Sequence, residues 1–209
     1  DISNNKLTNI PESIGGLKKL EYFNLENTNI KKLPDSIGQL LNLKKLTIIN
    51  NEKLANLPES ISNMKNLETF NLWGNDIKKL PESFSQLSNL KELMISNIED
   101  LVDFLESVGN LKKLETFQLV YSSIKKLPES IGQLSNLREL RIYENSKLIE
   151  IPESIGNLEN LEELKFSGNK IKKLPKSLGQ LSKLIDLSID YSGKIDPCRQ
   201  IRTVKLGRF

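Results

Sequence analysis

The chain of 209 residues contains no histidine, a single cysteine and two methionines. Without histidine it cannot form a Cys/His zinc site or a histidine-based catalytic triad, and one cysteine cannot build an intrachain disulfide framework. No apolar run approaches the roughly 20 residues that a membrane-spanning helix needs. An Asn-x-Ser/Thr sequon is also missing, which weakly disfavours a glycosylated ectodomain.

The net charge of +3 arises at the end of the chain. Residues 199–209 carry four basic side chains and no acidic one, so 26 basic groups (30 less these 4) face 27 acidic groups elsewhere. A nucleic-acid-binding protein usually presents a clustered basic face, and this body lacks the surplus for one. The sequence therefore predicts no nucleic-acid partner.

A repeat of 23 or 24 residues dominates the chain. Seven prolines each follow Leu or Ile and precede an x-Ser pair, and Leu105 takes the proline position in one further unit, so that the spacings alternate strictly between 23 and 24. The prolines are Pro11, Pro34, Pro58, Pro81, Pro128, Pro152 and Pro175. An apolar frame of the type L-x-x-L-x-L-x-x-N-x-L follows each, and a period of 20–29 residues with this frame indicates leucine-rich repeats.

The spacing within one unit predicts its local structure. The segment x-Leu-x-Leu-x has the period of two of a strand with one buried face, whereas P-E-S-I-G-x-L favours a short helical turn. One unit cannot bury its apolar side alone, so neighbouring units must stack into a parallel sheet. The expected fold is a curved α/β solenoid of about nine strands, with a parallel β-sheet on the concave face and short helical or 3-10 turns on the convex face.

A polar position follows each strand. Its amide is expected to pair with backbone groups that would otherwise be buried without a partner. Ile98 cannot do this, so Ile98→Asn is expected to raise stability by up to roughly 1 kcal/mol, unless Ile98 is well buried. The position is filled by Asn5, Asn51, Asn75, Asn145 and Asn169, with Thr28, Ser122 and Ser192 as smaller substitutes.

Because units of 23 and 24 residues alternate, the true period is a pair of units, 47 residues long. One column then alternates in charge along the array: Glu21, Lys44, Glu68, Lys91, Glu115, Arg138 and Glu162. Opposite charges on neighbouring strands attract, so this column is interpreted as setting register and solubility rather than as a charge-reading site.

Stretches such as LPESIGQLSNLREL and IPESIGNLENLEELKFSGNKIKKLP resemble the leucine-rich repeat superfamily in its 23-residue bacterial form. They are most similar to the repeat proteins of leptospires and other spirochaetes, and next to plant intracellular Ras-group-related repeats. The resemblance covers residues 1 to about 196. It implies a protein-binding scaffold, some members being secreted or surface-exposed at the host interface, and it carries no catalytic residue over.

Three departures from the repeat define the expected organisation, an array over 1–196 and an irregular basic end over 197–209. Residue 1 already fits inside a strand, so a capping repeat is missing and the chain is expected to be trimmed or preceded by disordered residues. The fifth unit loses both Asn (Ile98) and Pro (Leu105), which is interpreted as drift, with altered curvature as the alternative. At the end, IRTVKL is interpreted as a shortened capping strand, with a frayed tail as the alternative.

No constellation of acid, base and nucleophile is present, so neither catalysis nor a cofactor is predicted. Cys198 is interpreted as an incidental thiol because no histidine could activate it. Lysine doublets recur at every second repeat, and a solvated edge is favoured over a polyanion-binding stripe. They are Lys31–Lys32, Lys78–Lys79, Lys125–Lys126 and Lys172–Lys173.

The concave face is the candidate binding surface. The only Trp and all four Tyr fall on its outward positions, whereas four phenylalanines take inward ones, and interfaces are enriched in Trp, Tyr and Met. Four acidic residues, Glu92, Glu139, Glu163 and Asp186, are expected to form a rim that favours a partner with basic character. The predicted partner-binding residues are Tyr22, Ile49, Trp73, Met94, Val120, Tyr121, Tyr143 and Tyr191.

Two classes of function follow. The preferred hypothesis is a non-enzymatic module that binds a protein or peptide on the concave face, in host or partner recognition. The alternative is the recognition or regulatory part of a larger signalling protein or effector enzyme whose catalytic domain lies outside this chain. A secreted or surface-exposed bacterial location is favoured over the cytoplasm, and the oligomeric state is left open.

Overall fold

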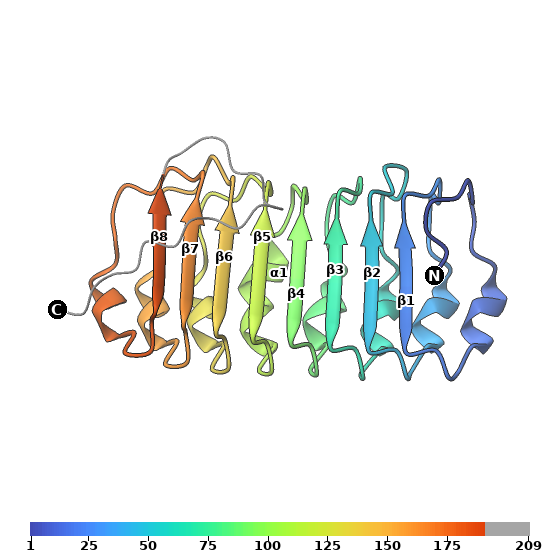
Figure 1. The fold of residues 1–209 in the computed structure, drawn as a ribbon, viewed down its shortest axis with the longest axis horizontal. Coiled ribbons are helices and arrows are strands. Elements are labelled where there is room, and N and C mark those ends of the chain that lie inside the picture. The colour runs from blue at the N-terminus through green and yellow to red at the C-terminus, as the bar shows by residue number, and fades with distance from the viewer. Residues whose placement is uncertain (191–209) are drawn as a thin grey trace.

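The structure is a computed structural model that describes residues 1–190. One open parallel sheet runs along the molecule, and its strands follow each other in chain order (Figure 1). This is the α/β solenoid that the repeat predicts. Among the described residues the strands are β1 Tyr22–Glu26, β2 Lys45–Ile49, β3 Thr69–Trp73, β4 Glu92–Ser96, β5 Thr116–Val120, β6 Glu139–Tyr143, β7 Glu163–Ser167 and β8 Asp186–Asp190.

A row of short helical turns lies behind the sheet in Figure 1. Most begin after a proline in an extended conformation (Pro34, φ −70°, ψ 152°), which has no N–H to leave unpaired at the helix start. The 3-10 turns are η1 Glu12–Gly16, η2 Asp35–Gln39, η3 Glu59–Asn63, η4 Glu82–Gln86, η5 Val108–Asn110, η6 Glu129–Gln133, η7 Glu153–Asn157 and η8 Lys176–Gln180, and the fifth unit adds the α-helix α1 Val102–Ser107.

Glycine in these turns lets neighbouring units approach closely. A Cβ atom on Gly38 would lie 2.2 Å from the backbone oxygen of Ser60 in the next unit, and one on Gly132 would lie 2.4 Å from that of Ser154. Such contacts are too short for any side chain. The S-I-G sequence therefore sets how tightly the helical row can stack.

The core fills the space between sheet and turns. The second and fourth residues of the strands point into it, and the four phenylalanines predicted to face inward do so: Phe23 is 5% exposed, and Phe70, Phe117 and Phe166 are fully buried. Leucine and isoleucine from every unit complete one continuous cluster. Each layer is covered by the next, which is why single units of this size do not fold alone.

The polar position after the strands forms the predicted ladder. Asn51 Oδ1 accepts from the backbone N–H of Thr28 at 3.1 Å, and Asn75 Oδ1 accepts from that of Asn51 at 3.0 Å. Asn75 also donates from Nδ2 to the carbonyl oxygen of Ile48 at 2.8 Å. Asn145 and Asn169 repeat this pattern in later units, with Ser122 as the donor of the first bond. Each amide thus satisfies backbone groups of two neighbouring units at a turn that water does not reach.

The ladder is interrupted at Ile98, as the sequence predicts. Ile98 is only 1% exposed, and it has no amide to accept the N–H of Asn75 in the way that Asn75 accepts that of Asn51. In the same unit the N–H of Gly74 donates to the hydroxyl of Ser96 at 3.0 Å, whereas the equivalent N–H of Asn50 donates to the carbonyl oxygen of Trp73. Since Ile98 is packed in the core, the condition under which Ile98→Asn would be stabilising is not met, and that prediction is reversed below.

The alternating charge column pairs as expected. Lys44 lies 3.0 Å from Glu21, Lys91 lies 2.9 Å from Glu68, and Arg138 lies 2.7 Å from Glu162. The hydrogen bond and the opposite charge raise the pKa of Lys44 and lower that of Glu68. These side chains are exposed, so the pairs favour register more than they add stability.

A second set of carboxylates joins the helical turns. Glu59 accepts from the N–H and the hydroxyl of Ser83 in the next unit, at 3.3 and 2.6 Å, and Glu153 accepts from the N–H groups of Lys176 and Ser177 at 3.1 and 3.0 Å. The first-turn N–H groups of a helix have no partner within it. These hydrogen bonds lower the pKa of Glu59 and Glu153 below the ordinary value of 4.5.

The first residues of the chain differ from the predicted strand, and the predicted C-terminal cap lies outside the described residues. Residues 2–4 pair with β1 through Ile2 N to Asn24 O (3.1 Å) and Asn4 N to Glu26 O (2.8 Å), but they form no regular strand, and the first strand begins at Tyr22. Ser192, Cys198 and the expected capping strand lie outside the described residues. The domain boundary at 196 therefore stays a prediction.

Ile98→Asn should lower the free energy of unfolding by roughly 1 kcal/mol. Burial of an isoleucine contributes about 1.5–3 kcal/mol, whereas a new hydrogen bond contributes about 0.5–1.5 kcal/mol net. Denaturation in urea measures the difference. The matched change at a regular unit, Asn145→Ile, should cost more because it leaves buried backbone groups unpaired, and an Ile98→Asn protein as stable as the wild type would contradict the expectation.

The double variant Glu59→Gln, Glu153→Gln should be less stable than the wild type near neutral pH. Because the folded-state pKa of each carboxyl is lowered, its stabilisation is fully present above the ordinary pKa and is lost as the pH falls through the folded-state value. Urea midpoints measured from neutral pH to about pH 2 should therefore converge. Glu82→Gln is the control, since the Glu82 carboxylate makes no hydrogen bond to any residue of the described range and its removal should change little.

Candidate partner-binding surface

The concave face is formed by the first, third and fifth residues of each strand. Parallel register places equivalent residues side by side, so that Tyr22 lies beside Lys45, Asn24 beside Thr47, and Ile49 beside Trp73. Because successive strand residues point to opposite faces, these side chains point away from the core. The repeat thus turns one residue per unit into a straight column across the sheet.

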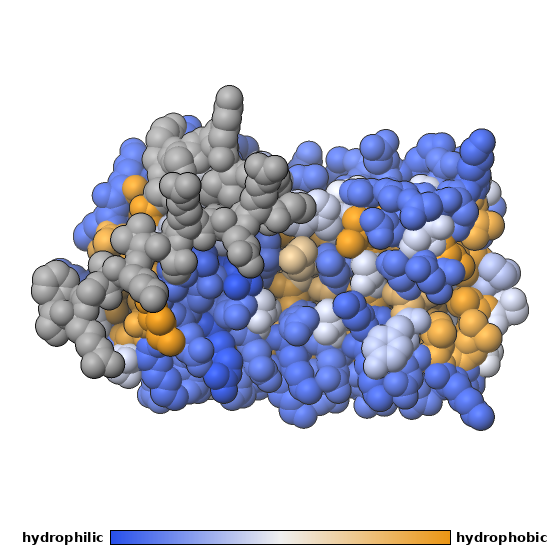
Figure 2. Space-filling model, in the orientation of Figure 1, coloured by the Kyte–Doolittle hydropathy of each residue, from blue (hydrophilic) through white to orange (hydrophobic). Residues whose placement is uncertain are grey.

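The half of this face over β1–β4 carries mostly neutral side chains, with Glu26, Lys45 and Glu92 as its charged members, and we call it the N-terminal sheet surface. Tyr22 is 64% exposed, and the predicted residues Ile49, Trp73 and Met94 are partly exposed. Figure 2 shows pale and orange residues interspersed with blue over these strands. The surface comprises Tyr22, Asn24, Glu26, Lys45, Thr47, Ile49, Thr69, Asn71, Trp73, Glu92, Met94 and the buried Ser96.

The other predicted residues do not continue this surface. Val120 is fully buried and Tyr143 is 5% exposed, so neither is an exposed anchor, although they lie side by side in the register of β5 and β6. Tyr121 is 43% exposed. Tyr191 lies outside the described residues. The single column predicted from the sequence is therefore divided, and its exposed aromatic part lies toward β1.

The position that directly follows each strand is a turn rather than a part of the flat face. Asn27, Asn50, Gly74, Asn97 and Gly168 have φ between 52° and 71° there, the left-handed region that glycine and asparagine tolerate best. Tyr121 and Glu144 occupy it at φ 52° and 55°. The sequence pattern placed Tyr121 on the binding face, but the backbone sets it at the edge of the sheet, where the chain turns away.

Charged side chains on β6–β8 form a connected network that the sequence analysis missed. Arg141 pairs with Glu139 at 2.9 Å and with Glu163, and Lys165 lies 2.8 Å from Glu163 and 3.0 Å from Asp186. Burial alone would raise the pKa of Glu163, but hydrogen bonds from Arg141 and Lys165 outweigh it and lower that pKa. Where β6 and β7 are visible in Figure 2 the surface is strongly hydrophilic.

This network corrects the predicted acidic rim. Three of its four members, Glu139, Glu163 and Asp186, are paired with Arg141 and Lys165, so that most of their negative charge is compensated within the protein. Glu92 accepts a hydrogen bond from the Thr69 hydroxyl at 3.3 Å. The signal was available in the sequence, because Arg141 and Lys165 occupy the position between the strand leucines, next to the acidic column.

Within residues 1–190 there is no group of three or more Cys, His, Asp or Glu side chains placed to hold a metal ion, and none of the helices is both long and apolar enough to span a membrane. The concave face instead carries side chains that can make noncovalent contacts with a partner. It offers apolar and aromatic groups with neighbouring amides and hydroxyls on rigid strands.

Comparison with known proteins agrees with the fold. The family described as leucine-rich repeat region matches residues 48–143, and the shorter Leucine Rich Repeat pattern matches 19–40, 136–158 and 160–181. Such arrays are typically non-catalytic modules for protein–protein interaction. A curated relative, an Arabidopsis thaliana protein named for disease resistance, is 43% identical over 49 residues, which is 23% of this chain and 3% of that protein.

Solved structures match over nearly the whole chain. A Leptospira interrogans leucine-rich repeat protein is 32% identical with a TM-score of 0.79, covering 90% of this chain and 47% of its own. The leucine-rich repeat domain of the type III effector XopL is 27% identical with a TM-score of 0.78, covering 90% and 67%. This chain thus spans about half the length of the Leptospira protein. It belongs to the leucine-rich repeat family and resembles its bacterial members.

Proposed function

We propose that the chain binds a protein or peptide on the N-terminal sheet surface of its concave face. The observation that carries this proposal is the adjacency of Ile49 and Trp73 in the register of β2 and β3, partly exposed on a face whose neighbouring strands carry no buried charge network. Tryptophan on a rigid strand loses little conformational freedom when a partner covers it, and it is enriched among the residues that dominate binding energy.

The surrounding groups suit a polypeptide ligand. Asn24, Thr47 and Asn71 lie in the column next to Ile49 and Trp73, and amide and hydroxyl groups can bond the backbone of an extended segment. Met94 on β4 extends the apolar part and adapts its shape easily to a partner. By contrast, the paired charges on β6–β8 would lose hydrogen bonds if a ligand displaced them, so that half of the face is the less favourable one.

The alternative is that the chain acts as the recognition part of a longer protein. It is supported by the XopL match, which concerns one domain of an effector, and by the small share of the Arabidopsis protein that this chain covers. The sequence of the complete gene distinguishes the two. We further propose a secreted or surface location in a bacterium with a role toward a host, which fractionation of cells that express the native gene would test.

The single tryptophan allows a direct test of the binding surface. Peptides selected from a random phage-display library against the immobilised protein should quench or shift the emission of Trp73 when titrated in solution. The double variant Ile49→Ala, Met94→Ala should weaken their binding by about 2 kcal/mol, the size of a hot-spot loss, or roughly 30-fold. Circular dichroism should show an unchanged fold, because both side chains are partly exposed.

The matched control is Leu41→Ala, which removes an exposed apolar side chain (53%) outside the strands. It should leave affinity unchanged. Tyr143→Ala, which the sequence pattern suggested as a test, is unsuitable because Tyr143 is buried and its loss would lower stability. Selected peptides that bind the Ile49→Ala, Met94→Ala protein as tightly as the wild type, without a change in Trp73 emission, would exclude this surface.

A further inference from the structure

The irregular fifth unit changes the path of the chain behind the sheet. In regular units an extended segment leads from the strand to a proline, and a residue before proline is restricted to extended conformations. With Leu105 in the proline position this restriction is absent, and residues Val102–Ser107 form α1, closed by a bond from Leu105 N to Leu101 O at 2.8 Å. Phe104 anchors the helix against Phe84 at 5.5 Å and Phe117 at 6.4 Å.

This change opens a groove between the fifth and sixth units, which we call the α1 groove. A helix rises about 1.5 Å per residue against about 3.3 Å for extended chain, so α1 covers less of its neighbour than an extended segment would. The cavity measures about 490 Å³, within the range of ligand-binding clefts. It is lined by Glu99, Leu101, Val102, Leu105, Glu106, Ser123, Ile124, Lys125, Lys126, Pro128 and Lys147.

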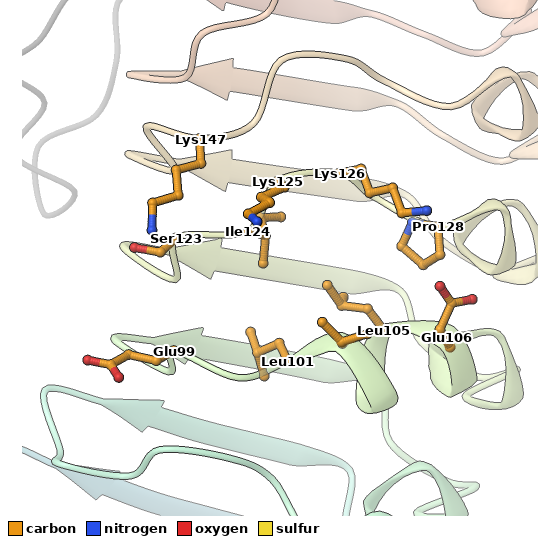
Figure 3. A pocket seen from close by; sticks show the side chains of 11 residues that line it. Glu99, Leu101, Leu105, Glu106, Ser123, Ile124, Lys125, Lys126, Pro128 and Lys147 are labelled. Carbon is orange, nitrogen blue, oxygen red and sulfur yellow. The ribbon is translucent and has the colours of Figure 1, made fainter.

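The floor of the groove is apolar. Leu101, Leu105 and Ile124 are 1%, 3% and 7% exposed and meet in its centre, between the two units (Figure 3). Val102, at the start of α1, is 65% exposed. An exposed valine beside a buried leucine floor offers contact area for one large apolar side chain of a ligand, and about 25 cal/mol per Å² of apolar surface would favour its burial.

Charge in the groove is unequal. Figure 3 shows Glu99 and Glu106 on the side of α1, and Lys125, Lys126 and Lys147 on the opposite side. Glu99 lies 3.9 Å from Lys78, outside the groove, whereas none of the three lysines forms a salt bridge with another residue of the range 1–190. The three lysines outnumber the two carboxylates of the groove, and an anionic ligand on the lysine side would meet them without having to break an existing pair.

The backbone at the mouth of the groove is strained. Ser123 has φ 52°, a left-handed conformation that is uncommon for residues other than glycine and asparagine, and it comes two residues after Tyr121, which is also left-handed. No other unit in the described part of the chain has a second such residue at this place. Strain of this kind persists only where the surroundings determine it, and it is concentrated at binding sites.

We propose that the α1 groove binds an extended acidic peptide segment that inserts one large apolar side chain. The apolar side chain packs on Leu101, Leu105 and Ile124, while flanking carboxylates pair with Lys125, Lys126 and Lys147. The site lies on a different face from the N-terminal sheet surface and is independent of the function proposed there. It would give the array a second contact, and two linked contacts bind more tightly than either alone.

Fluorescein-labelled pentapeptides Asp-Glu-X-Glu-Asp, with X as Leu, Ile, Phe, Trp or Ala, are the probes, titrated with the full chain and followed by anisotropy. Peptides with a large apolar X should bind at least tenfold more tightly than the Ala peptide and than Lys-Lys-X-Lys-Lys. Affinity should fall as salt is raised. Trp73 emission should stay unchanged with the Leu, Ile and Phe probes, which separates this site from the N-terminal sheet surface.

Two variants locate the site. The variant Lys125→Glu, Lys126→Glu reverses the charge of one wall of the groove, and Val102→Glu places a charge at an exposed position beside its floor. Because these side chains lie outside the core, neither variant disturbs it. Each should weaken peptide binding at least tenfold. Lys31→Glu with Lys32→Glu is the matched control, because this doublet holds the same place in a regular unit, and it should change affinity less than twofold.

If the two lysine-doublet variants lose the same affinity for the peptide, the effect is one of net charge alone, and the proposal is overturned. Binding that Val102→Glu leaves intact would also overturn it, as would a shift of Trp73 emission with the Leu probe, which would move the peptide to the concave face. The absence of binding by every acidic probe at millimolar concentration would overturn it as well.

Discussion

The array depends on the mutual covering of neighbouring units. Each unit buries its leucines only against the next, and the backbone at the end of each strand becomes inaccessible to water in the process. The asparagine ladder makes this burial possible, because Asn51 and Asn75 supply acceptors and donors to buried backbone groups at the ends of the strands. Apolar burial provides the driving force, and the ladder removes the penalty that would otherwise oppose it.

The charged residues have a secondary, ordering role. Three ion pairs of the alternating column, and carboxylates that bridge helical turns, such as Glu59 and Glu153, connect neighbouring units in one register. If a unit packed against its second neighbour instead of its first, like charges of the column would face each other, because the sequence repeats every two units. On the concave face, Arg141 and Lys165 likewise pair with acidic residues of the neighbouring strands.

Departures from the repeat create the features on which specific function can be built. Regular units all present the same backbone, whereas Leu105 and Ser123 lie where the backbone departs from the repeat, and Ile98 removes one amide from the ladder. The loss of one proline converts an extended segment into α1 and opens a groove behind the sheet. The concave face differs from unit to unit in single side chains on an unchanged backbone, whereas the groove arises from a change of the backbone itself.

The sequence by itself determined the solenoid, the inward phenylalanines, the polar ladder and the charge column, because a fixed period places equivalent residues in equivalent surroundings. It also predicted the interruption at Ile98, but not that the Ser96 hydroxyl would accept the N–H of Gly74. Exposure was decided only by tertiary structure: Ile49 and Val120 share a column, yet one is partly exposed and the other is fully buried. Periodicity reports the direction in which a side chain points, whereas its burial depends on every group that packs nearby in space. For the same reason the α1 groove, which needs two units and a helix between them, could not be predicted from the spacing of residues along the chain.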